Sequence, residues 1–501
     1  MPIHPWTRRS TAALLLLATL CAASLAGLTH PWFEATNETY DASIYLACAK
    51  SLLAGEGYSV LGMPFNVRPP GFSLVLAPVL AARGLDFLAL NLLVGAFGVA
   101  AVLGLFVLAR ERQGDLPAFC VALALFLNPG FRHLSNQVMS DVPGLALTLL
   151  GLVLARWAER APSARRDLGL GLGIGLGAHL RTAVVLVVPA VLLARALARG
   201  RSAQATSFLR FARQRMLVLP VATLAVLVPW SFRNALHHPP WPAEQTLLAS
   251  YSTGMWHVDG GDPDSPWIAP GDLFSRARVQ APRILADLGG RLDPQAAGAL
   301  PTVLGAAMLA AIAWVALRRR EPLEMFALVS FGVLAVYFAH DWRLALPVFA
   351  VGLVSVAEVL AAAVARFAGL KAGSAAAAAG ALALLVLDFA PRRGWEEIRA
   401  AHEVDLATAG ALRAELAPEA RLAAPVGWHW SVLLDRPVYS LYFAGKRGGG
   451  NGVLRVIDER GIDAVIVRTE PEEARRTLEL LELRYGKSQA LGPVAVVRTK
   501  R

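Results

Sequence analysis

Four apolar runs that contain no charged residue constrain this chain more than any other feature of its sequence. They cover residues 11–29, 88–109, 216–232 and 294–317. A helix of about 20 apolar residues is long enough to cross a bilayer. Charged residues make up only 17% of the 501 residues, whereas roughly a quarter of an average soluble domain is charged. The runs therefore predict a membrane protein and exclude an ordinary soluble enzyme.

The first run has two interpretations. Arg8 and Arg9 precede it and small residues lie near its end, as in a secretory signal peptide. Its length of about 19 residues is closer to that of a membrane anchor. We therefore expect this run to be retained as the first span.

Shorter apolar stretches raise the expected number of spans to about eleven. Basic residues gather in alternate loops between them, for example at Arg110 and Arg112. Such loops face the cytoplasm under the positive-inside rule. The net charge of +11 thus reports orientation rather than binding to nucleic acid. The expected spans are 11–29, 88–109, 117–128, 141–155, 168–180, 182–194, 216–232, 296–317, 325–339, 344–364 and 374–390.

The opposite loops are expected to face the periplasm of a bacterium, with the spans in its inner membrane. An all-α polytopic membrane domain is predicted over 1–391, with periplasmic loops at about 30–72 and 233–295. Residues 392–501 combine amphipathic helix patterns with short β-like runs, which predict a small α/β domain outside the membrane. The helix patterns cover 405–416 and 471–483, and the β-like runs cover 461–469 and 492–499.

Several local patterns receive no chemical role. Cys21, Cys48 and Cys120 are scattered, so they indicate neither a disulfide framework nor a metal site. Glycines occupy every second position from 169 to 177 without a preceding strand, and within a span they predict close helix packing rather than a phosphate loop. Carbohydrate contact and a packed core are equally good interpretations of Trp428, His429, Trp430 and Asp435.

Ionisable residues collect at the outer ends of the expected spans. Carboxylates and arginines together suit transfer from a phosphate-linked donor, because a carboxylate can accept a proton and a guanidinium binds phosphate oxygens in pairs. The alternative is that these residues anchor the chain at the membrane boundary. Their gathering on one side favours a functional role. The group comprises Asp41, Arg68, Asp141, Arg181, Arg233, Asp341 and Arg343.

Three of these outer positions have local structural features. Arg68 precedes a proline pair, which holds the segment extended and starts the next helix. Asp141 opens a span, where a carboxylate can cap the helix. Tyr45 belongs to a series of aromatic and apolar residues at the spacing of an interfacial helix. Such a helix would hold Asp41 near the lipid headgroups.

In their order, these motifs resemble those of the GT-C glycosyltransferases, which include the dolichyl-phosphate-mannose protein mannosyltransferases and the aminoarabinose transferase acting on lipid A. The resemblance runs over most of residues 10–391. Ala42 departs from the pattern, since several relatives carry a second acid after the first. The matching positions are Asp41, Tyr45, Ala49 and Gly55 in the first outer loop, Arg68 before Pro-Pro, Asp141, the pair Arg181 and Thr182, Pro229 to Asn234, and Asp341 to Pro347.

The resemblance implies an inverting hexosyl- or pentosyltransferase that takes a sugar from a polyprenyl-phosphate donor in the membrane. A glycan, lipid or protein would be the acceptor, and no organic cofactor is implied. Asp41 would be the catalytic base and Asp141 would orient the acceptor or the sugar. No ligand-spacing motif supports a divalent cation on these two acids. The implied substrate-binding residues are Arg68, Tyr45, Arg181, Arg233, Asp341 and Arg343.

Two other functions fit a polytopic protein that handles lipid-linked substrates. A transporter would place its polar site near the midplane between repeated halves, and the sequence shows no repeat. A polysaccharide polymerase or ligase would share the donor and the large outer loops. An acid so close to the first span favours the glycosyltransferase.

Overall fold

The computed structural model describes residues 6–33, 40–199, 216–237, 255–258, 265–293, 295–368, 372–376, 378–380, 394–470 and 472–499. They form two compact units, each assembled from separate segments of the chain. Unit 1 consists of residues 1–30, 91–236 and 266–391, and unit 2 consists of residues 31–90, 237–265 and 392–501.

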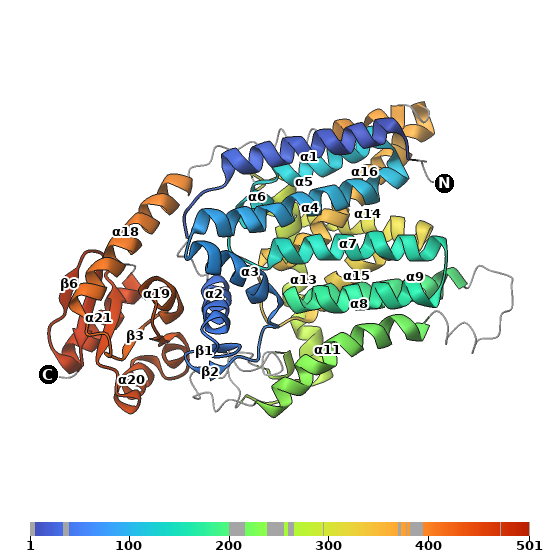
Figure 1. The fold of residues 1–501 in the computed structure, drawn as a ribbon. Helices are drawn as coiled ribbons and strands as arrows, with labels where there is room; N and C mark the ends of the chain where they lie inside the picture. Colours follow the sequence, from blue (N-terminus) through green and yellow to red (C-terminus); the bar gives the residue numbers. More distant parts are fainter. Residues whose placement is uncertain are drawn as a thin grey trace. The chain divides into compact units, whose positions relative to one another are not determined.

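Unit 1 is a bundle of apolar helices (Figure 1). Local signals start several of these helices: the side chain of Thr7 caps α1 in a capping box with Ser10, Ser163 caps α8, and Pro322 occupies the first turn of α15. The helices are α1 (Arg8–Leu28), α4 (Phe87–Gln113), α5 (Asp115–Leu127), α6 (Pro129–Ser135), α7 (Asp141–Arg160), α8 (Ala164–Leu180), η2 (Thr182–Leu186), α9 (Val187–Arg199), α11 (Val218–Leu236), α13 (Pro270–Leu292), α14 (Leu300–Arg319), α15 (Pro322–Val336), η5 (Trp342–Ala345) and α16 (Leu346–Ala368).

The predicted polytopic membrane architecture is confirmed. Among the described residues, six helices are long and apolar enough to cross a bilayer, or seven if the bent pair α5 and α6 forms one span, which is fewer than the about eleven spans expected from the sequence. The expected spans 182–194 and 325–339 fall on shorter apolar helices, and residues 381–390 of the last expected span lie outside the described residues. The helix α13 was not predicted, because it lies in the expected loop over residues 233–295.

The alternate glycines of α8 allow close packing at Gly171, Gly175 and Gly177, as predicted, whereas Cβ atoms at Gly169 and Gly173 would meet no neighbour within 4 Å. A methyl group on Gly171 would lie 2.6 Å from the carbonyl oxygen of Leu219, and one on Gly175 would lie 2.7 Å from Cβ of Val226. The hydroxyl of Thr223 also donates to the carbonyl of Gly171 over 3.1 Å. Because the contacts advance in the same direction along both helices, α8 and α11 run parallel and their C-terminal ends lie at the same end of unit 1.

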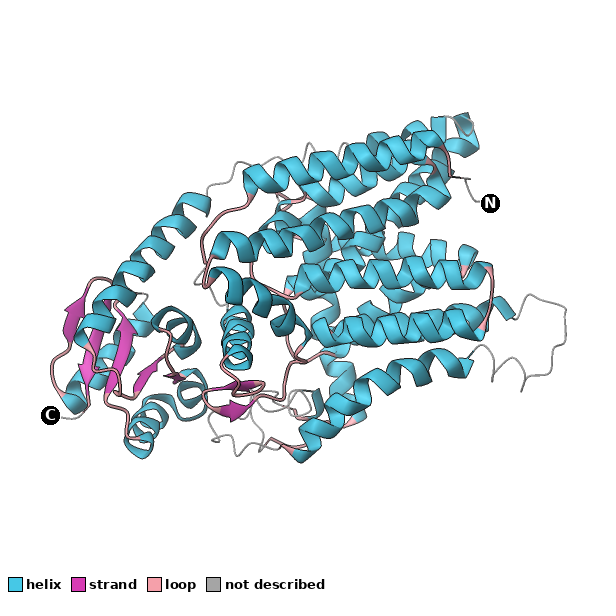
Figure 2. Cartoon of the chain, in the orientation of Figure 1, coloured by secondary structure: helices cyan, strands magenta, loops and turns pink. Residues whose placement is uncertain are grey.

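Unit 2 contains all the described strands assigned to sheets (Figure 2). A short antiparallel pair, β1 (Ser59–Val60) and β2 (Met63–Pro64), lies between α2 (Tyr40–Leu53) and α3 (Gly71–Arg83). The C-terminal segment forms a five-stranded sheet in the order β4-β3-β5-β7-β6, with parallel pairing of β3 to both β4 and β5 and antiparallel pairing of β7 to both β5 and β6.

The C-terminal sheet and its helices confirm the predicted small α/β domain. The expected β-like runs become β5 and β7, whose side chains are almost all buried. The elements of this part are α18 (Gly394–Glu415), β3 (Leu422–Ala424), α19 (Gly427–Leu434), β4 (Val438–Ser440), α20 (Tyr442–Arg460), β5 (Ala464–Arg468), α21 (Glu472–Tyr485), β6 (Gln489–Leu491) and β7 (Val494–Arg498).

Candidate functional site

Four of the predicted site residues meet in unit 1, and we call them the Asp141 cluster: Asp141, Arg181, Asp341 and Arg343. Asp141 lies in the first turn of α7 with its side chain 1% exposed. Its Oδ1 lies 2.7 Å from Nη2 of Arg181, and its Oδ2 lies 3.7 Å from Nη1 of Arg343. Nε of Arg343 is 2.5 Å from Oδ2 of Asp341. Two buried-to-partly-buried carboxylates are thus neutralised by two guanidinium groups.

Local structure aims both arginines at Asp141. Arg181 ends α8 in an extended conformation and also donates from Nη1 to the hydroxyl of Ser140 over 3.1 Å. Its side chain passes over Gly144, where a Cβ atom would lie 2.3 Å from Cδ of Arg181. Arg343 is held from the other side, because Oδ1 of Asp341 accepts its backbone N–H over 3.1 Å and so caps η5.

This geometry bears on the alternative that Asp141 is only a helix cap. The N-cap position of α7 belongs to Ser140, whose side chain makes no capping hydrogen bond. The carboxylate of Asp141 instead faces two arginines from distant parts of the chain. The side chains of Arg181 and Arg343 are 19% and 14% exposed, so both side chains remain partly accessible. Such an arrangement can bind phosphate oxygens.

Burial alters the acid strength of Asp341. Its partly desolvated carboxyl has a pKa above the ordinary value, and the negative charge of Asp141 adds to this rise, while Arg343 opposes it. A carboxyl that retains its proton more readily than usual, next to paired arginines, is a common feature of functional sites.

Arg233 lies in the last turn of α11, at the same end of unit 1 as Arg181 because α8 and α11 run parallel. Its guanidinium carbon lies 5.0 Å from the ring centroid of Trp230, and Nη1 donates to the side chain of Asn234 over 3.1 Å. Arg233 therefore lies at the same end of the helix bundle as the Asp141 cluster. Its contacts include Trp230 and Asn234.

The other predicted residues meet in unit 2. Arg68 forms an ion pair with Asp41 through Nη2 and Oδ1, with side chains 12% and 19% exposed. The guanidinium carbon of Arg68 also lies 5.8 Å from the ring centroid of Tyr45. As expected, the proline pair after Arg68 starts a helix, with Pro70 as the N-cap of α3.

Tyr45, expected on an interfacial helix, lies on α2. Its side chain is buried and packs edge-on against Phe72 of α3 at 5.0 Å between centroids. The hydroxyl of Ser73 donates to the carbonyl of Tyr45 over 3.0 Å. The helix α2 is therefore fixed by packing within unit 2, because its apolar residues find protein partners in α3.

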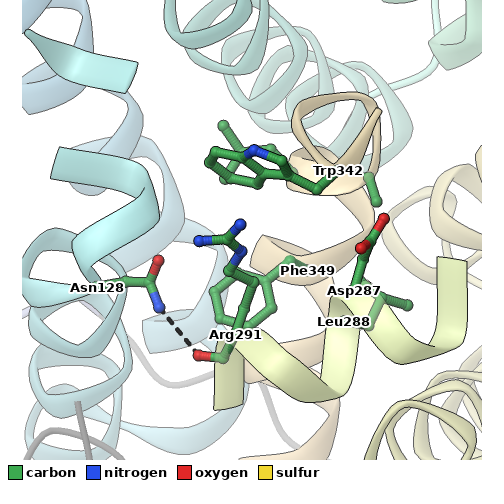
Figure 3. A pocket seen from close by; sticks show the side chains of 8 residues that line it. Asn128, Asp287, Leu288, Arg291, Trp342 and Phe349 are labelled. Carbon is green, nitrogen blue, oxygen red and sulfur yellow. Dashed lines mark hydrogen bonds between the residues drawn. The ribbon is translucent and has the colours of Figure 1, made fainter. Parts of the chain in front are cut away.

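A pocket beside the Asp141 cluster brings together residues that the sequence analysis missed (Figure 3). The guanidinium carbon of Arg291 lies 3.7 Å from the ring centroid of Trp342, and the side chain of Asn128 donates to the carbonyl of Arg291 over 3.0 Å. Gly130 leaves room for this pair, since a Cβ there would lie 2.7 Å from Nη1 of Arg291. The one sequence signal for this pocket is that Trp342 lies between two predicted site residues, Asp341 and Arg343.

The pocket is also lined by the carboxylate of Asp287, which pairs with an imidazole. Oδ2 of Asp287 lies 3.1 Å from Nε2 of His340. Burial raises the pKa of Asp287, while His340 and Arg291 oppose the rise and Asp341 adds to it. Within the described part of the chain, no three His, Cys, Asp or Glu side chains group as metal ligands would.

Comparisons with known proteins match by structure and not by sequence. No protein-family model matches the chain, and no curated protein matches it significantly. The structure is similar to that of ArnT from Cupriavidus metallidurans bound to undecaprenyl phosphate, with 12% identity, a TM-score of 0.61 and coverage of 98% of both chains. The same enzyme in the apo state matches with 13% identity and the same TM-score and coverage.

A second similar structure is the archaeal oligosaccharyltransferase AglB from Archaeoglobus fulgidus, in complex with an inhibitory peptide and a dolichol-phosphate. It matches with 13% identity and a TM-score of 0.54, over 98% of this chain and 74% of AglB. The chain has the GT-C glycosyltransferase fold. The GT-C architecture predicted from the order of the sequence motifs is thereby confirmed, and the identities are low enough that the likeness speaks for the fold alone.

Proposed function

We propose that this protein is a membrane glycosyltransferase that moves a sugar from a polyprenyl-phosphate carrier to an acceptor. The observation that carries the proposal is the shared GT-C fold, over 98% of both chains, with an enzyme solved with undecaprenyl phosphate bound. The two groups of acids and arginines support it, because they supply the charges that such a transfer requires.

The proposed reaction is a single displacement at the anomeric carbon. The oxygen of an acceptor hydroxyl forms a bond to that carbon, and Asp41 takes the proton of the hydroxyl. The bond between the carbon and the phosphate oxygen breaks, and polyprenyl phosphate leaves with the bonding electrons. Configuration inverts because only one displacement occurs. Arg68 holds the carboxylate of Asp41 in place through their ion pair.

The leaving phosphate gains negative charge as the bond breaks, so fixed positive charge lowers the barrier. We assign this role to Arg181 and Arg343, with Arg233 as a further contact to the carrier phosphate. Asp141 sets the orientation of the first two, since each approaches one of its oxygens. The transfer includes no redox step and no carbanion, so the proposed mechanism needs no organic cofactor.

The proposed place of the reaction is the periplasmic face of a bacterial inner membrane. Basic residues cluster at the end of unit 1 opposite the Asp141 cluster, for example Arg156 and Arg160 at the C-terminal end of α7. The positive-inside rule assigns that end to the cytoplasm. A glycan, a lipid or a protein on the outer side would then be the acceptor, and the sugar a hexose or a pentose.

The test compares purified wild type with Asp41→Asn in detergent. Each protein receives a panel of polyprenyl-phosphate sugars with membrane extract as acceptor, and mass spectrometry measures free polyprenyl phosphate. We expect release by the wild type and a loss of at least about 100-fold in the variant. Asp115→Asn is the matched control, because Asp115 pairs with Arg110 at 3.0 Å and has no assigned role. Absence of release from every donor by folded wild type would instead favour a transporter or a polymerase.

A further inference from the structure

The first outer segment belongs to the same compact unit as the C-terminal sheet domain. Residues 31–90 carry Asp41 and Arg68, and residues 392–501 carry the sheet, yet some 300 residues, most of them in unit 1, lie between them in the sequence. A domain that only covered the helix bundle would not need to share a core with this segment. The contacts within unit 2 show how the two parts are joined.

Both ends of the outer segment contact histidines of the C-terminal domain: Phe33 contacts His402 and His429, and Phe87 contacts His402. The ring of Phe33 stacks on His429 at 5.5 Å between centroids and on Phe87 at 4.8 Å. Phe87 in turn packs edge-on against His402 at 5.5 Å, and the backbone N–H of Phe33 donates to Nδ1 of His402 over 3.4 Å. The helices α18 and α19 therefore fix where the outer segment begins and where it ends.

The helix between these ends is held by the same part of the domain. α19 packs against α2, the helix that carries Asp41. Nζ of Lys50, in the last turn of α2, donates to Oδ1 of Asp435 over 2.6 Å and to the carbonyl of Val432 over 3.3 Å. This ammonium thus satisfies a carbonyl at the C-terminal end of α19, where a positive charge is favourable.

The position of α19 is itself fixed by buried side chains and by an ion pair with α18. Trp428 and Trp430 are buried, so the domain uses them as core rather than as a carbohydrate surface. Nε2 of His429 lies 2.9 Å from Oδ2 of Asp405, whose side chain is fully buried and also accepts two hydrogen bonds from Arg468, at 2.7 and 2.8 Å. His429 and Arg468 hold the pKa of Asp405 below its ordinary value against the opposing effect of burial.

We propose that the C-terminal domain positions the catalytic helix, with Lys50 and Asp435 as positioning residues that act on Asp41 through α2. This proposal rests on the proposed role of Asp41 as the base. It assigns the domain a part in the chemical step, through the α19 contact, rather than a role in covering the bundle. Loosening that contact should lower kcat and leave the donor KM unchanged, because the donor phosphate is assigned to arginines of unit 1.

The test reverses the charges of the contact one at a time and together. Lys50→Asp and Asp435→Lys are each expected to lower kcat about threefold with the donor KM unchanged, because the Asp435 side chain is 73% exposed and exposed ion pairs contribute little free energy. Hydrogen exchange measured by mass spectrometry should be faster for the amides of residues 40–53 in each variant. The double variant with both charges exchanged should lose less kcat than Lys50→Asp alone, and its recovery should be incomplete because a carboxylate at position 50 cannot donate to the carbonyl of Val432.

Asp458→Lys provides the control on the same domain. Asp458 accepts a hydrogen bond from Tyr485 over 2.8 Å and pairs with Arg484, both on α21, so it tests a general effect of charge reversal. We expect its kcat and its exchange in residues 40–53 to match the wild type. Equal losses in this variant and in Asp435→Lys would overturn the proposal.

Several outcomes separate this proposal from the proposed function. If the wild type transfers no sugar, the proposed function fails, and exchange in residues 40–53 still decides whether α19 holds α2. If transfer occurs but the single reversals change neither kcat nor exchange, the positioning proposal is rejected while the proposed function stands. Should a reversal prevent folding, the milder pair Lys50→Met and Asp435→Asn replaces it, with smaller changes in the same direction expected.

Discussion

The helix α7 carries a group of ionic residues at each end, and the two groups differ in how far their central residues are buried. The Asp141 cluster lies at its N-terminal end. At its C-terminal end lies what we call the Arg112 network, in which arginines and glutamates from α4, α7, α14, α15 and α16 pair with one another. About 30 Å of helix separates the two groups. The network comprises Glu111, Arg112, Arg156, Arg160, Arg319, Glu321, Glu324 and Glu358.

Access to solvent distinguishes the centres of the two groups. At the centre of the Arg112 network, the side chains of Arg112 and Glu324 are both 0% exposed, so their ion pair is sealed inside the bundle. At the centre of the Asp141 cluster, Asp141 is 1% exposed but its partners Arg181 and Arg343 are 19% and 14% exposed. The central pair thus joins helices at one end of α7, whereas the central carboxylate at the other end is paired with arginines that remain partly exposed. Four substitutions test this contrast.

The largest expected effect is on stability, from Glu324→Gln. This change leaves the sealed guanidinium of Arg112 without its closest carboxylate, and breaking a buried ion pair costs about 3–5 kcal/mol. Thermal unfolding in detergent should show a much lower Tm, while transfer per folded molecule stays near the wild-type value. Glu321→Gln serves as the comparison, and its loss should be smaller because Glu321 is 27% exposed.

The largest expected effect on activity comes from Arg343→Lys. Lysine keeps the charge but lacks the planar fork that binds two phosphate oxygens, so we expect kcat to fall about 100-fold with little change in Tm. Arg319→Lys is the matched change at the other end, where Nε of Arg319 lies 2.5 Å from Oε1 of Glu358. Equal losses of transfer in the two variants would break the comparison.

Asp341→Asn should raise the stability of the protein slightly near neutral pH, whereas Glu324→Gln should lower it. Burial raises the pKa of Asp341, so between its unfolded and folded pKa values unfolding releases a proton. The wild type therefore loses stability as pH rises through this window, and the asparagine variant does not. The Tm of the variant relative to wild type should increase from pH 4 to pH 7. A relative decrease over that range would contradict the assigned cause.

The smallest effect is expected from Arg160→Gln. Arg160 pairs with Glu111, but its side chain is 46% exposed, and exposed ion pairs contribute only about 0–1 kcal/mol. Tm and transfer should both stay close to the wild type. A large loss of Tm would show that the Arg112 network extends as a unit to its exposed edge.

The order of motifs along the sequence predicted the right residues at the Asp141 cluster, yet it could not predict their partners. Asp141 pairs with Arg181 from the end of α8 and approaches Arg343 from the start of η5, far along the chain. The neighbours Asp287 and Arg291 were missed because α13 is not apolar throughout and carries Pro282, so its sequence resembles a polar loop. Its packing against α14 and α15 makes it a helix.

The sequence by itself determined the membrane spans, the α/β character of residues 392–501 and the ends of the helices where acids and arginines gather. These are properties of local composition and periodicity, which the cost of placing polar groups in lipid enforces at each span separately. Only the tertiary structure decided which charges are sealed and which are accessible. It also decided that Asp41 shares a compact unit with the C-terminal domain, because packing joins residues that no local pattern connects.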